Sequence, residues 1–178
     1  MSLFSRVSSR RQAAEWHLLA DMDGLGLKTF LQPGQLSRPE TVARELEAMD
    51  QVEARNEAYL QELGDALQEF IAGGSQLSAG ASGRSNRLQQ DIDTELGFQR
   101  KYAACNRAML GTIRRVLVFA DQRRDKLQMG DGKLMLPSKE ELAIYNAYIA
   151  QLGQQKAAVD ELIARQVQQR ESRIKPAP

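Results

Sequence analysis

A long repeat of apolar positions constrains the fold of this chain more than any other feature of its sequence. Between residues 42 and 70 these positions follow one another at alternating steps of four and three residues. They are Val42, Leu46, Met49, Glu53, Asn56, Leu60, Leu63, Leu67 and Phe70. Because such steps return to the same side of an α-helix, the repeat predicts one long helix with a continuous packing seam.

The ends of this helix are also indicated by the sequence. Ser37 and Glu40 have the spacing of a capping box, in which the serine hydroxyl accepts from the Glu40 amide and the carboxylate reaches back. Pro39 fits the first turn, where the missing amide hydrogen costs nothing. The glycine pair at 73–74 is expected to end the helix. The prediction is therefore a helix over 37–72.

A segment rich in glycine and serine, residues 73–86, follows this helix and is expected to be a flexible linker. A second long helix is expected over 85–127. Gly97 and Gly111 lie within it, and each costs about 1 kcal/mol relative to alanine, so a kink or a close helix crossing is expected there. Its apolar positions are Leu88, Ile92, Leu96, Tyr102, Met109, Ile113, Val116, Leu117 and Ala120, with Gln99, Ala103 and Asn106 near the seam.

A break at residues 130–132 separates this helix from the last one. The apolar residues 134–136 are interpreted as either a strand-like clip or a packed loop. A second capping box, Ser138 to Glu141, starts a helix that fades near residue 172, before a frayed tail over 173–178. The predicted seam of this helix is Leu142, Tyr145, Ile149, Leu152, Lys156, Val159 and Ile163.

Together these segments predict an all-α protein. A short N-terminal helix over 10–22 completes an elongated antiparallel helical bundle with three long helices, in one domain over 1–178. The first long helix carries three basic and nine acidic residues, whereas 84–127 carries ten basic and five acidic ones. This opposite charge favours placing the two helices side by side, although each surface ion pair adds little stability.

Composition excludes several classes of site. One cysteine and one histidine cannot supply a cysteine-based zinc site or a di-iron bundle centre. Residues 21–26 match three positions of a calcium loop, but Gln32 stands where a bidentate glutamate is needed, so a helix-ending turn is favoured. His17 and Cys105 are interpreted as structural residues. We predict no catalytic residue, no cofactor and no metal ligand.

Two groups of charged or polar residues are candidates for interaction. The basic stretch 100–126, which includes Arg107, Arg114 and Arg115, is interpreted as a solvated, paired face, with binding of nucleic acid or an anionic membrane as the alternative. Glu53 and Asn56 interrupt the first seam. Either they are buried and set register or form a polar network, or the seam rotates and both face water.

Residues 130–152 carry one resemblance. The run Gly130-Asp131-Gly132-Lys133-Leu134-Met135-Leu136-Pro137-Ser138, with Leu142 and Tyr145-Asn146-Ala147-Tyr148, resembles the C-terminal part of small helical bacterial envelope proteins of unknown function. The resemblance implies a periplasmic or membrane-associated role and no active site. No apolar stretch is long enough for a transmembrane helix, so the chain as written is expected in the cytoplasm, with the periplasm as the alternative if a leader was removed.

Three functions follow as expectations. The first is a non-enzymatic helical interaction or scaffold protein, which binds another protein or itself as a homodimer through the first and last long helices. The second is the envelope-associated protein, and the third is a nucleic-acid or membrane-surface binder that uses 100–126. An enzyme is not expected, because no nucleophile–base pair, metal cluster or phosphate loop is evident.

Overall fold

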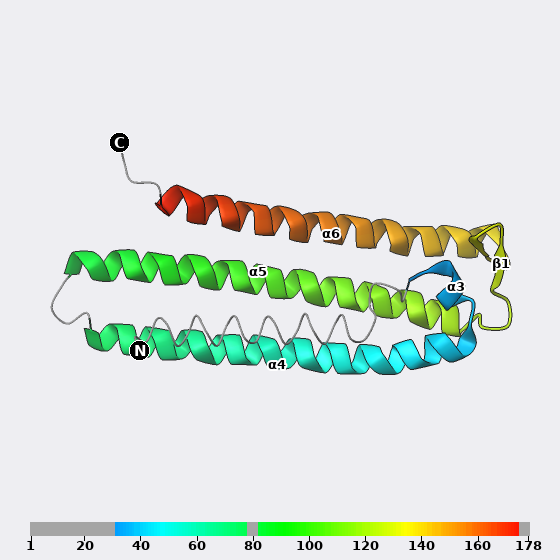
Figure 1. The fold of residues 1–178 in the computed structure, drawn as a ribbon, viewed down its shortest axis with the longest axis horizontal. Coiled ribbons are helices and arrows are strands. Elements are labelled where there is room, and N and C mark those ends of the chain that lie inside the picture. The colour runs from blue at the N-terminus through cyan, green and yellow to red at the C-terminus, as the bar shows by residue number, and fades with distance from the viewer. Residues whose placement is uncertain (1–30, 78–81, 175–178) are drawn as a thin grey trace. The chain divides into compact units, whose positions relative to one another are not determined.

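The computed structural model describes residues 31–77 and 82–174, and it is mostly helical over these ranges, as predicted. The elements in chain order are α3 (Pro33–Leu36), α4 (Pro39–Leu77), α5 (Ser82–Asp121), β1 (Gln128–Gly130), β2 (Lys133–Met135) and α6 (Lys139–Ile174) (Figure 1). The helix predicted over 10–22, His17, the turn at 21–26 and the residues after Ile174 lie outside the described residues.

The chain forms two compact units, and both α4 and α5 pass through them. Of the described residues, unit 1 contains 51–77 and 82–101, and unit 2 contains 31–50 and 102–174. Unit 2 holds both strands and all of α6.

The Gly/Ser-rich segment corrects the sequence prediction. Helix α4 continues through the glycine pair to Leu77, and α5 begins at Ser82, so most of the segment predicted as a linker is helical. Each glycine costs a helix about 1 kcal/mol, but every added residue of a long helix also adds a backbone hydrogen bond, so the glycines do not stop it. No close crossing occurs at Gly97 or Gly111, because a Cβ built at either meets nothing within 4 Å.

A tight hairpin joins α5 to α6. Helix α5 ends at Asp121, six residues before the predicted end, and β1 pairs with β2 in an antiparallel register that matches Met129 with Leu134. The strand-like reading of 134–136 is therefore confirmed in part, since β2 ends at Met135. Asp131 and Gly132 form the connection with φ angles of 50° and 72°, which is the signature of a two-residue primed turn. Leu134 is buried, and β2 contacts α3.

The left-handed backbone at Gly132 gives a stability prediction with opposite signs at two glycines. We expect Gly132→Ala to lower the free energy of unfolding by about 1 kcal/mol, because a Cβ is strained at this φ. Gly111→Ala should raise it by about 0.5–1 kcal/mol, because Gly111 is helical with open space around it. Urea unfolding followed by circular dichroism measures both, and equal signs for the two variants would contradict the turn assignment.

The start of α4 differs from the predicted capping box. The Ser37 hydroxyl donates a hydrogen bond to the carbonyl of Gly34 at 3.2 Å, because residues 33–36 form a helical turn of their own and Ser37 ends it. The carbonyl of Arg38 instead accepts from the amides of Thr41 and Val42, so the first turn of α4 starts one residue later. The capping box was predicted from spacing alone, and it does not form because Ser37 caps the end of the short helix α3 instead.

The buried face of α4 is also rotated from the predicted seam. Val42, Glu45 and Met49 are buried in unit 2, where they share the core with α3 and α5, while the predicted seam residue Leu46 is only half-buried. In unit 1 the buried series continues through Val52, Asn56, Tyr59 and Ala66. The other buried side chains of the unit 2 core include Leu36, Leu110, Val116, Leu117 and Ala120.

Candidate functional site

Aromatic contacts attach α6 to α5 within unit 2. Phe119 of α5 is only 5% exposed, and its ring lies 6.4 Å from the ring of Tyr145 and 6.2 Å, edge-on, from the ring of Tyr148. The guanidinium of Arg123 lies 3.8 Å from the centre of the Phe119 ring. Burial in this contact raises the pKa of the Tyr145 phenol. Such ring pairs and cation–π contacts each stabilise a packed interface by about 0.5–2 kcal/mol beyond the area they bury.

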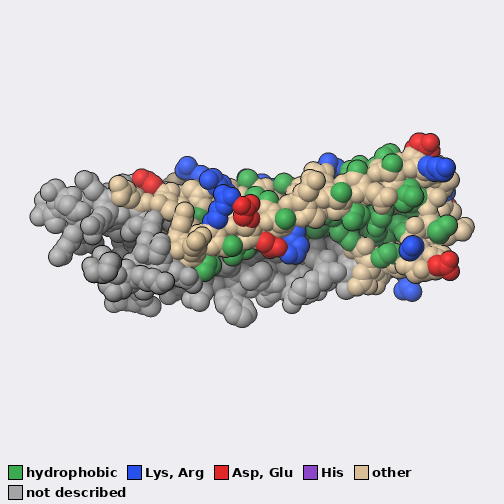
Figure 2. Space-filling model, turned by 90° about the horizontal axis from the view of Figure 1, so that it is seen from above, with side chains coloured by type: hydrophobic (Ala, Val, Ile, Leu, Met, Phe, Trp, Pro, Cys, Tyr) green, Lys and Arg blue, Asp and Glu red, His purple; other side chains and the backbone are tan. Residues whose placement is uncertain are grey.

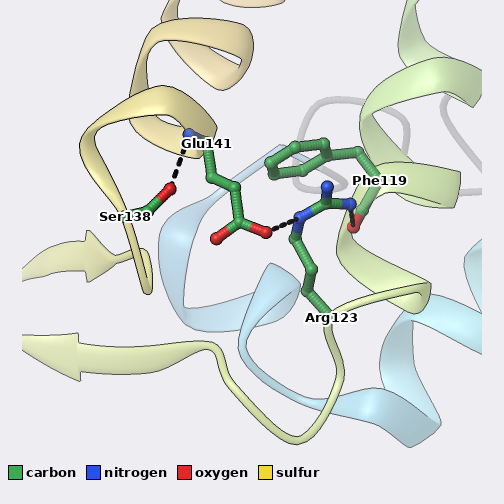
Figure 3. Close-up of polar contacts among 4 residues, drawn as sticks. All are labelled: Phe119, Arg123, Ser138 and Glu141. Atoms are coloured by element: carbon green, nitrogen blue, oxygen red, sulfur yellow. Dashed lines mark hydrogen bonds and ion pairs between the residues drawn. The ribbon is translucent and has the colours of Figure 1, made fainter.

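Arg123 also closes the junction of α5, the hairpin and α6, as Figure 3 shows. Its Nε donates to Glu141 Oε1 at 2.7 Å and its Nη1 donates to the carbonyl of Phe119 at 3.1 Å. The Glu141 amide in turn donates to Ser138 Oγ at 3.2 Å, which confirms the serine half of the second capping box. The carboxylate half differs from the prediction, because the Glu141 carboxylate accepts a hydrogen bond from Arg123. Both charged groups are mostly buried, at 20% and 22% exposure.

Further contacts continue along the two helices. Arg115 lies over the ring of Tyr148, 5.6 Å from its centre, and donates to Gln151 Oε1 at 3.4 Å. Gln155 Nε2 donates to the carbonyl of Ala108 at 3.2 Å. Since positions in α5 fall while positions in α6 rise from one contact to the next, this part of α5 and α6 runs in opposite directions.

The predicted arginine site is occupied by contacts inside the chain. Arg114 forms an ion pair of 2.5 Å with Asp50 of α4, and Arg115 donates to Thr112 Oγ1 at 2.8 Å in addition to its contacts with α6. Arg107 is exposed, and it has an interaction of its own. In the stretch 100–126 these contacts agree with a paired face.

The two predicted polar seam residues, Glu53 and Asn56, lie in unit 1. Asn56 is buried, at 2% exposure, whereas Glu53 is only half-buried and has an interaction within the chain. Asn56 thus follows the buried alternative, and the register role remains a prediction.

The outward side of α6 is the least expected feature of unit 2. The residues that face the interior are Glu141, Tyr145, Tyr148, Leu152, Gln155, Val159, Leu162 and Gln166. Three residues of the predicted seam, Leu142, Ile149 and Ile163, are instead exposed at 43%, 38% and 41%, so the predicted seam is corrected. Phe119 and Arg123 fix the rotation of α6, because they hold Tyr145, Tyr148 and Glu141 toward α5.

We call these exposed residues the outer strip of α6, which comprises Leu142, Asn146, Ile149, Gly153, Lys156, Asp160, Ile163 and Val167. All are exposed, and they follow one another at steps of four and three residues along one side of the helix. Figure 2 views the molecule from the side on which α6 lies in Figure 1, and hydrophobic side chains are visible among the polar ones there. The strip has two charged members, Lys156 and Asp160, which pair at 2.5 Å.

Glu45 is a second unusual residue of unit 2. Its side chain is 3% exposed, and its Oε2 atom accepts no hydrogen bond. Loss of water around the carboxylate raises the pKa of Glu45 to about 7, against the opposing effect of the nearby positive charge of Arg44. A carboxyl group in this setting changes its charge near neutral pH.

Other chemistry is sparse in the part of the chain that the structure describes. Within residues 31–77 and 82–174 no group of three or more His, Cys, Asp and Glu side chains is arranged to hold a metal ion. Over the same ranges, no helix is both long enough and apolar enough to cross a membrane. Cys105 is half-buried and forms no disulfide.

The sequence predicted a homodimer through the last long helix but not which of its residues face outward, and it gave no indication that Glu45 is a buried acid. The strip had a signal, because apolar residues of α6 occupy two adjacent faces, and Tyr148 and Leu162 fall beside the predicted seam. Glu45 had none, since it is one of nine acidic residues in a segment that reads as a solvated charged face.

The chain was compared with protein-family models, with curated proteins and with solved structures, and none of these comparisons gives a match.

Proposed function

We propose that this protein is a non-enzymatic helical interaction protein and that the outer strip of α6 is its docking surface. The observation that carries this proposal is the alignment of Leu142, Ile149, Ile163 and Val167 on one exposed side of a helix. Single exposed apolar residues are ordinary on protein surfaces, but a row over about seven turns of helix is the pattern that a partner helix or groove recognises.

The energetics support the same proposal. Full burial of a Leu, Ile or Val side chain contributes about 1.5–3 kcal/mol. The four such side chains on the strip are partly exposed, so a partner that covers them would gain the rest of this free energy. Phe119 and Arg123 contact the neighbouring side of α6, which faces α5, so docking on the strip requires no rearrangement of that packing. An elongated antiparallel bundle of the three long helices would serve as the scaffold that presents α6.

The charged stretch 100–126 supports this function better than nucleic-acid binding. Arg114, Arg115 and Arg123 each contact a carboxylate, an amide oxygen or an aromatic ring of the chain itself. A phosphate backbone would have to replace these contacts, whereas binding on the outer strip leaves them intact.

Site-specific photo-crosslinking tests the proposal in cells that express the full chain. A photoreactive phenylalanine analogue at position 149 or 163 should form one discrete protein adduct, and the same analogue at the exposed polar position Gln154 should form none. Ile149→Glu should reduce the adduct formed from position 163 by at least about tenfold, because it places a charge in the middle of the surface that docking would bury. Circular dichroism serves as the folding control for Ile149→Glu, which changes an exposed side chain. Equal adducts at all three positions, or none at any, would contradict the proposal.

A further inference from the structure

We infer that the occupant of the outer strip is α6 of a second copy of this chain, packed antiparallel to the first. This inference rests on the proposed function, because it names the partner for the same surface. It is carried by the order of residues along the strip, which is complementary to itself in one orientation.

The complementarity follows from the spacing. Two antiparallel helices related by a twofold axis level with Ala158 bring Ile149 opposite Val167 of the second copy. In the same register Gly153 lies opposite Ile163 of the second copy, so a large side chain meets the space above a glycine. Each of these layers occurs twice because of the twofold symmetry. The strip alternates between two kinds of position, those reached by a four-residue step and those reached by a three-residue step, and every layer pairs one of each kind.

Charge decides between the antiparallel and the parallel arrangement. In the antiparallel register, Lys156 lies opposite Asp160 of the second copy, and Asp160 lies opposite Lys156 of the second copy. In a parallel register, lysine would meet lysine and aspartate would meet aspartate. These are the two charged residues of the strip, and within each copy they already lie 2.5 Å apart, so a small change in side-chain direction exchanges the partner. Opposite charges favour the antiparallel pair and like charges disfavour the parallel one.

The open flank of the strip allows a close approach. Ala143, Ala150, Ala157 and Ala164 follow one another at steps of seven residues beside it, and all four are exposed. Because alanine adds little bulk, a second helix can reach the strip from this side at the short interhelical distances of packed helices. The second copy would thus contact Ile149, Ile163 and Val167 without contact with the side of α6 that packs on α5.

A pair of charge reversals tests this arrangement in the purified full-length protein. Sedimentation equilibrium of the unchanged chain should give twice the 19.9 kDa mass of one copy at micromolar concentration. Lys156→Asp and Asp160→Lys should each weaken the dimer by at least about tenfold, because each puts like charges opposite one another. An equimolar mixture of the two variants should restore dimerisation, since every cross-copy pair is then opposite in charge.

The mixture separates docking from helix stability. Within each variant chain the ion pair between positions 156 and 160 remains broken after mixing, so a purely structural role of this pair predicts no rescue. Glu161 and Arg165, which pair one turn further on outside the strip, offer the matched control. Arg165→Glu should leave the sedimentation mass unchanged.

Cysteine crosslinking then tests the register. In a Cys105→Ser background, Ile149→Cys and Val167→Cys chains should form a disulfide-linked heterodimer when they are mixed and oxidised, and neither should crosslink when it is alone. Efficient crosslinking of Ile149→Cys with itself would show a parallel pair and overturn the inference. A mass of 19.9 kDa at all concentrations would also overturn it. If an adduct with a different protein is nevertheless found from position 149 in cells, the docking function stands and only the identity of its occupant is wrong.

Discussion

Phe119→Ala is expected to lower the free energy of unfolding by about 3–5 kcal/mol, the largest effect among the substitutions considered. The ring is 5% exposed and contacts Tyr145, Tyr148 and the guanidinium of Arg123. Its loss leaves a cavity at the contact between α5 and α6 and removes the surface on which Arg123 lies. Urea unfolding monitored by the helical circular-dichroism signal measures the difference in unfolding free energy.

Val118→Ala is the matched control for this prediction. Val118 precedes Phe119 in α5 but is 38% exposed, so its truncation should change the free energy of unfolding by about 0.5 kcal/mol or less. Equal losses from the two variants would mean that the contact of Phe119 with α6 does not determine the stability of this region.

The stability of the protein is expected to fall between pH 4.5 and pH 8 because of Glu45. The pKa of this carboxyl is raised from 4.5 to about 7 in the folded chain, so folding favours the protonated form. This contribution is fully present below the unfolded pKa and is lost as the pH rises through the folded pKa. A shift of this size corresponds to at most about 3 kcal/mol of unfolding free energy.

Glu45→Gln isolates that contribution from the other carboxylates. Glutamine has nearly the same shape and no charge, so at pH 8 the variant should be more stable than the unchanged chain, and the difference should shrink toward pH 5. Unfolding curves of the two proteins in urea, recorded at several pH values, provide the comparison. A difference that does not vary with pH would show that Glu45 ionises in the folded chain as readily as in the unfolded one.

The existence of the long helices could be predicted from the sequence because their apolar residues recur at steps of three and four. The hairpin was predictable in part for a similar local reason, since Asp131-Gly132 suits a primed turn. The serine half of the second capping box was also predictable, because Ser138 and the Glu141 amide are close along the chain. These features depend on neighbours in sequence, so one chain is enough to identify them.

The rotation of α4 and α6 could not be predicted in the same way. In α6 the series through Leu142, Ile149 and Ile163 and the series through Tyr148 and Leu162 are both apolar, and the periodicity alone does not rank them. The choice is made by contacts with residues far away in sequence, above all Phe119. The candidate site is the series that these contacts leave outside, so it appears only when the fold is known.

The hairpin has a consequence for the order in which unit 2 assembles. It brings Arg123 and Glu141, which are 18 residues apart, into contact, so the first closed loop between α5 and α6 is short. The hydrogen bond from Gln155 to the carbonyl of Ala108 spans 47 residues, but after the first loop has closed it requires little additional loss of chain entropy. We therefore expect α5 and α6 to pair progressively from the hairpin outward, and the outer strip to reach its final orientation before α4 is in place.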